Sequence, residues 1–111
     1  MKNFQASAVE RRITVTHDFA SHPMEAGWAS EAIFFIIVEE VSGAQATLET
    51  SVEISADGIN WIDEGTSFAA IHSPGHYAAK VSHFGNWLRV HGKITGTNPA
   101  FKLSVHLHLK G

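Results

Sequence analysis

The chain contains no cysteine among its 111 residues. This absence excludes disulfide bonds, zinc sites built on thiolates and thiol nucleophiles. Long apolar runs are also missing, because the longest one, residues 32–38, is far shorter than the ~20 residues of a membrane-spanning helix. Residues 1–9 lack the apolar stretch of a signal peptide. We therefore expect a protein without membrane partners, located in the cytoplasm or in a particle assembled there.

Two long stretches each lack charge of one sign. Residues 31–64 contain eight acidic residues and no lysine or arginine, whereas residues 65–111 contain five basic residues and no acid. Such segregation leaves two explanations open, which are acidic and basic strands side by side in one fold, or pairing between subunits. The net charge of −3 argues against nucleic acid as a partner. Charged residues make up only 17% of the chain, which favours a surface partly covered by another subunit.

The sequence also lacks the short motifs of common active sites. It has no nucleophile elbow of the Gly-x-Ser-x-Gly type, no phosphate-binding Walker loop and no dinucleotide-binding Gly-x-Gly-x-x-Gly. Serine, histidine and aspartate are all present, but no spacing selects a catalytic triad. We expect a protein that is not an enzyme and that needs no cofactor.

Strand signals dominate what is present. Residues 11–17 and 46–55 alternate between apolar and polar side chains, as half-buried strands do. Residues 32–41 are apolar on both faces, which indicates a strand that is covered on both sides or that meets a partner. With no convincing long helix and no linker, the sequence predicts one domain over residues 1–111. Its expected fold is an all-β antiparallel β-sandwich or jelly roll of about seven to eight strands.

Two hairpins are predicted from turn residues. Asp57-Gly58 predicts a two-residue turn in which both residues have positive φ, so that Ile54 faces Trp61. Residues 96–99 predict a loop that joins strands 87–95 and 101–110. The alternation of these two strands predicts which side chains face the core and which face away. The core-facing set is Leu88, Val90, Val105 and Leu107, and the opposite set is Arg89, Lys93, Lys102 and His106.

Eight histidines raise the question of a metal site. His106 and His108 lie two apart on one strand face, at a spacing that can hold both imidazoles on one ion, and the predicted hairpin adds His91 on the neighbouring strand. Residues 65–111 offer no carboxylate, and Arg89 would repel a cation. We therefore predict no metal site, although any other role of these histidines stays open.

The aromatic residues suggest a second function class. Trp61 and Trp87 could form a stacking platform for sugars, which would make the protein a carbohydrate-binding module. Tryptophans in small β proteins more often anchor a core or an interface. A binding module and an assembly subunit therefore both remain open.

Four segments of the second half resemble a recurrent pattern in small phage virion proteins. They are the Ser-x-Asp-Gly-x-Asn-Trp of residues 55–61, the Trp-Leu-Arg-Val of residues 87–90, the Gly-Thr-x-Pro of residues 96–99, and the alternating residues 101–109. The resemblance implies a β-sandwich subunit of a head, neck, tail or decoration. It also implies location in a virion and possible contact with other virion proteins.

These observations together predict a structural subunit that forms a homo-oligomer. In the predicted head-to-tail contact, an apolar strand supplies affinity, and acids of one subunit face bases of the next. The expected interface residues are Phe34, Ile36, Val38, Glu49, Glu53, Arg89 and Lys93. The sequence does not indicate the stoichiometry or the particle.

Overall fold

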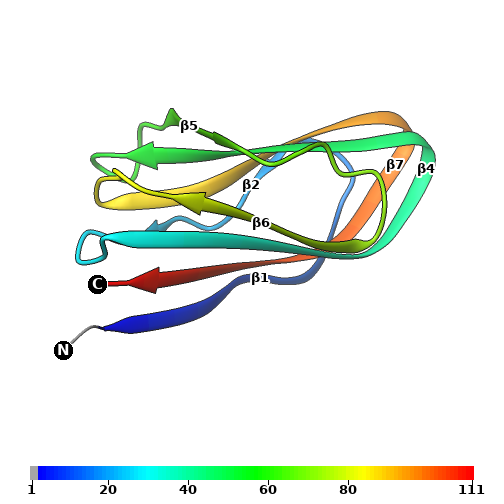
Figure 1. The fold of residues 1–111 in the computed structure, drawn as a ribbon. Helices are drawn as coiled ribbons and strands as arrows, with labels where there is room; N and C mark the ends of the chain where they lie inside the picture. The colour runs from blue at the N-terminus through cyan, green and yellow to red at the C-terminus, as the bar shows by residue number, and fades with distance from the viewer. Residues whose placement is uncertain (1–2) are drawn as a thin grey trace.

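The computed structural model describes residues 3–111, and these residues form strands and connecting loops without a helix (Figure 1). The all-β prediction is thus confirmed, and none of the described residues forms a helix long and apolar enough to cross a membrane. The strands are β1 (Phe4–Val15), β2 (Phe19–Ala20), β3 (Met24–Glu25), β4 (Glu31–Ser55), β5 (Ile62–Ser67), β6 (Gly75–Val81) and β7 (Trp87–Lys110).

All seven strands belong to one sheet, and every pairing in it is antiparallel. The main order is β1-β7-β4-β5, while β6 adds to β4 and the short β2 and β3 add to β7. The antiparallel arrangement and the number of strands agree with the sequence prediction. Because the hydrogen bonds connect the strands into one open sheet, the division into a sandwich or jelly roll stays a prediction.

Two unusually long strands, β4 and β7, form the centre of the sheet. They pair from Glu31 opposite Lys110 to Ser55 opposite Trp87, and both turn over at the right-hand end of Figure 1. The predicted hairpin between residues 87–95 and 101–110 is therefore wrong, because these residues form one strand. Val90 lies opposite Val52, and not opposite Val105.

Residues with left-handed backbone conformations mark the place where these strands turn. Gly43 and Gln45 on β4 have φ of 101° and 54°, and Gly96 and Asn98 on β7 have φ of 124° and 50°. The register between the two strands also shifts three times between Val38 and Thr47. Bulges of this kind bend a strand and increase its local twist. The glycine and asparagine of residues 96–99 thus produce a bend, where the sequence suggested a loop.

The inward faces of both halves of the bent strands contribute to one hydrophobic core. Leu88, Val90, Val105 and Leu107 are each at most 1% exposed, as predicted. Burial alone does not distinguish a hairpin from a bent strand, since both place the same side chains inward. The predicted hairpin was therefore right about the face of each segment and wrong about its pairing partner.

The turn after β4 also differs from the expected two-residue form. Strand β5 begins at Ile62, which lies opposite Ile54, so the connection is longer than Asp57-Gly58. Of these two turn residues only Gly58 has a positive φ, of 78°. Trp61 precedes β5 and does not pair with Ile54.

Candidate functional site

The apolar residues predicted for the interface lie in the core. Phe34, Ile36 and Val38 are 0–3% exposed and face inward from β4, so no partner can reach them. This corrects the prediction, which treated residues 32–41 as one apolar strand without deciding which face points outward. The alternate side chains Ile33 and Phe35, together with Ile37, face the other way.

These alternate side chains form the centre of an outward-facing cluster that we call the apolar outer patch. It consists of Phe4, Ile33, Phe35, Ile37, His106 and His108. In the β4–β7 register, Ile33 lies opposite His108 and Phe35 lies opposite His106. Ile33, Phe35 and Ile37 are half-buried, so part of each side chain stays accessible to solvent.

Ring contacts connect the patch across three strands. The His108 imidazole lies 4.8 Å from the Phe35 ring, measured between centroids, and makes an edge contact with Phe4 at 5.6 Å. Phe4 itself is 59% exposed at the start of β1. An open hollow beside Phe4 and His108 is also lined by Ile33 and Lys80. The sequence indicated this patch through residues 32–38, which are apolar at both alternating sets of positions. Nothing in the sequence pointed to Phe4.

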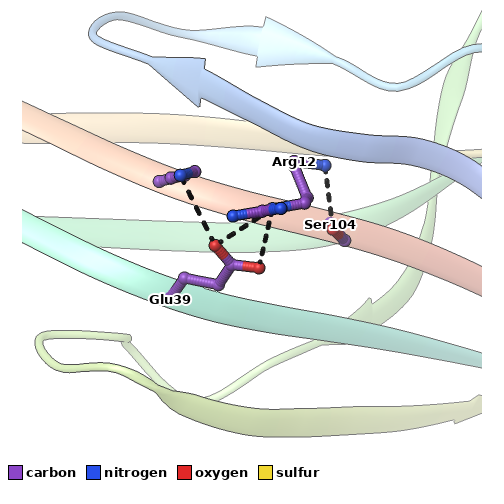
Figure 2. A network of polar contacts seen from close by, with 4 residues as sticks. Arg12, Glu39 and Ser104 are labelled. Carbon is purple, nitrogen blue, oxygen red and sulfur yellow. Dashed lines mark hydrogen bonds and ion pairs between the residues drawn. The ribbon is translucent and has the colours of Figure 1, made fainter.

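A polar network lies beside the patch, where the register between β4 and β7 first shifts (Figure 2). The Arg12 Nε lies 3.2 Å from Oε1 of Glu39, and the Lys102 Nζ lies 3.7 Å from the other carboxylate oxygen. The backbone N–H of Arg12 donates to the Ser104 hydroxyl at 2.9 Å. This network joins β1, β4 and β7. Because these ion pairs are partly exposed, we expect them to orient the three strands and to add little to the free energy of unfolding.

The charged residues predicted for the interface face one another within one chain. Glu53 lies opposite Arg89 and Glu49 lies opposite Lys93 in the β4–β7 register. Glu53 and Arg89 form an ion pair of 2.7 Å. Of the two explanations that the sequence left open, acidic and basic strands side by side is the arrangement in the structure. The other basic residues of β7, Lys102 and Lys110, likewise lie opposite acids of β4.

The two tryptophans proposed for sugar stacking pack against their own chain. The Arg89 guanidinium lies 4.3 Å from the centroid of the Trp61 ring. Gly58 approaches the indole of Trp87 so closely that an added Cβ would lie 3.1 Å from it. One face of each indole is therefore occupied, and both side chains are half-buried. The structure thus supports their role as anchors at this end of the sheet.

The histidines are divided by the bend. His91 pairs with Ser51 in one half of the sheet, while His106 pairs with Phe35 in the other, so the predicted neighbourhood of His91 and His106 is wrong. Within residues 3–111 no group of three or more histidine, aspartate or glutamate side chains could hold a metal ion. The prediction that no metal binds stays a prediction.

The Ser-x-Asp-Gly-x-Asn motif forms a polar turn around Asp57. Its Oδ1 accepts hydrogen bonds from the backbone N–H groups of Ile59 at 2.9 Å and Asn60 at 2.8 Å, and its Oδ2 accepts from the Asn60 side chain. The Ser55 hydroxyl donates to the same carboxylate and accepts from the Gly58 N–H. Donation from Asn60 and Ile59 holds the pKa of Asp57 well below its ordinary value. These hydrogen bonds make the turn a structural element.

No family model and no curated protein matches the chain. Among solved structures, it is similar to the crystal structure of the SPBc2 prophage-derived protein YomS, with a TM-score of 0.61 and 8% sequence identity. The match covers 100% of this chain and 96% of that protein. At this identity the similarity establishes a shared fold, and that fold is one that a phage-derived protein adopts.

Proposed function

We propose that this chain is a non-enzymatic structural subunit of a phage particle that associates with further copies of itself. The observation that carries the proposal is the apolar outer patch, where Phe4 is 59% exposed and the outward side chains of β4 are only half-buried. An apolar cluster that stays accessible on a folded chain is typical of a surface that another protein covers.

The chemistry of the patch suits a protein partner. Burial of apolar surface contributes ~25 cal/mol per Å², so a partner that covers Phe4 and Phe35 would gain free energy mainly from these side chains. Aromatic residues are also enriched at the centres of interfaces. The charges of Glu49, Glu53, Arg89 and Lys93 already have neighbours in the same chain, which shifts the proposed contact away from them.

The fold supports the same proposal. The inward faces of both halves of the bent strands contribute to one core, which supports the proposal of a β-sandwich subunit. The structural similarity to a prophage-derived protein agrees with the sequence resemblance to small virion proteins. A virion location and contacts with other virion proteins are part of this proposal. The carbohydrate alternative gains no support, since Trp61 and Trp87 pack against Arg89 and Gly58.

Light scattering coupled to size exclusion tests the proposal over a range of protein concentrations. We expect the wild-type chain to be larger than a monomer and Phe35→Glu to shift it towards the monomer, because a carboxylate in the patch opposes its burial. Ile59→Glu is the matched control, since Ile59 is 78% exposed outside the patch. A wild-type monomer at tens of micromolar would refute the proposal.

A further inference from the structure

We infer that two copies of this chain associate by antiparallel pairing of β1 with β1, about a two-fold axis at Ala6. This inference rests on the proposed function, because it names the contact between copies. It assigns an interaction surface to the N-terminal half of β1, which had no part in the predicted interface.

β1 lies at one end of the strand order and, among the described residues, pairs with β7 alone (Figure 1). From Phe4 to Ala8 the register with β7 is regular, and the first shift comes between Ala8 and Glu10. One side of this stretch therefore carries backbone groups that the sheet does not use.

The direction of these backbone groups follows from one hydrogen bond beside the start of β1. The Gly111 N–H donates to the Asn3 carbonyl, so the polar groups of Asn3 point towards β7. Direction alternates along an antiparallel strand, which turns Gln5 and Ser7 towards β7 as well. The N–H and C=O groups of Phe4, Ala6 and Ala8 consequently point to the free edge.

The edge of β1 differs in composition from the edges of β5 and β6. Proteins protect exposed edges with charged residues, proline or bulges. Residues 3–9 contain no charge, no proline and no glycine. By contrast, the edge strand β5 carries Asp63 and Glu64, and β6 carries Lys80. The regular stretch of β1 thus lacks the protection that β5 and β6 have.

A second copy of β1 fits this edge. With the two-fold axis at Ala6, each Ala6 lies opposite its equivalent, and Phe4 lies opposite Ala8 of the other copy. The free N–H and C=O groups of Phe4, Ala6 and Ala8 in one copy then face the free C=O and N–H groups of the same residues in the other copy. This is the hydrogen-bonded pattern of antiparallel strands. A large side chain faces a small one, and no two like charges face each other. Self-complementarity of this kind is what a two-fold interface requires.

Ala6 and Ala8 lie opposite His108 and His106, so their side chains share the outward face with the patch. Pairing at β1 would join the patches of two copies into one surface that crosses the axis. Phe4 would then lie beside Ala8 of the other copy, which covers part of a side chain that is 59% exposed in a single chain.

Sedimentation equilibrium of Ala6→Pro tests the pairing. Proline removes the Ala6 N–H, which points to the free edge. All hydrogen bonds between β1 and β7 are kept, because none of them uses this N–H. We expect the dissociation constant of the dimer to rise at least about tenfold, with an unchanged far-ultraviolet circular dichroism spectrum. Ala6→Ser, which keeps the N–H and a small side chain, is the control and should dimerise like the wild type.

Cross-linking provides the second measurement. The chain has no cysteine, so Ala6→Cys is the single site for a short bismaleimide, and we expect a covalent dimer. Ser67→Cys on the β5 edge should give none. The pairing is overturned if the wild type is oligomeric, Ala6→Pro associates equally well and Ala6→Cys does not cross-link. The proposed function would still stand in that case. A monomeric wild type overturns both, and a monomer that binds foreign extended peptides at β1 would assign the edge to a different protein.

Discussion

Glu53 on β4 and Arg89 on β7 lie directly opposite each other, and the Glu53 Oε1 is 2.7 Å from the Arg89 Nε. The side chains are only 20% and 23% exposed, and the Arg89 guanidinium also lies over Trp61. Solvent screens such a pair less than it screens a fully exposed one. The relationship shows that opposite charges of the two sequence halves meet inside one subunit.

A double-mutant cycle on Glu53→Ala and Arg89→Ala should therefore show coupling in unfolding free energy. We expect about 1 kcal/mol, measured by urea denaturation. Because the pair is intramolecular, this coupling should not change with protein concentration. The Glu49–Lys93 pair is the comparison, and its coupling should be smaller since Lys93 is exposed. Coupling that grows with concentration would instead indicate pairing between subunits.

The bend can be tested with three glycine-to-alanine substitutions. Gly43 has a φ of 101°, and an added Cβ would lie 2.5 Å from the Asn98 carbonyl oxygen, so Gly43→Ala combines strain with a clash. Strain alone costs about 1–3 kcal/mol. Gly65→Ala has the strained φ but open space, and Gly85→Ala has neither problem. Thermal unfolding should rank the loss of stability as Gly43, then Gly65, then Gly85. A neutral Gly43→Ala would contradict the bent geometry.

Thr50 is buried in the core, and its hydroxyl has no hydrogen-bond partner among residues 3–111. Thr50→Val removes this hydroxyl at nearly constant shape and should raise the unfolding free energy by about 1–2 kcal/mol. Ser55→Ala is the matched opposite, because the buried Ser55 hydroxyl accepts from the Gly58 N–H at 2.8 Å. We expect Ser55→Ala to lower stability. Equal effects of both substitutions in chemical denaturation would argue against the hydrogen-bond assignment.

The Asp57 turn should make stability depend on acid pH. The pKa of Asp57 is lowered in the folded chain, so its carboxylate contributes stability that is fully present above the ordinary carboxyl pKa. This contribution is lost as pH falls towards the lowered folded value. The melting temperature of the wild type should therefore approach that of Asp57→Ala below about pH 4, near the model-peptide pKa of aspartate. A constant difference between the two proteins from neutral to strongly acid pH would refute this role.

The histidines are expected to bind no structural metal. Addition of zinc or of EDTA at neutral pH should leave the melting temperature unchanged. A site that binds only the folded chain, at one hundred times its dissociation constant, would add roughly 2.7 kcal/mol. A rise of several degrees with stoichiometric zinc would contradict the prediction. His106→Ala and His108→Ala would then identify the ligands.

The alternation of side chains along the chain determined the faces of the strands. Leu88 and Leu107 face the core as predicted, since burial requires a period of two whichever strand lies alongside. The interface residues could not be chosen in the same way. Residues 32–38 are apolar at every position, so Phe34 and Phe35 are equivalent in sequence, and only packing sends one inward and the other outward.

The partners of the strands were decided by the tertiary structure alone. A turn-rich segment such as residues 96–99 is compatible with a hairpin or with a bulged bend, and both give the same buried side chains. The choice depends on β4, which pairs with β7 from end to end and bends at the same level. That pairing also brings the acids of residues 31–64 beside the bases of residues 87–110. The sequence by itself shows that the charges are segregated. Long-range pairing decides that the bases of β7 find acids of β4 within the same chain.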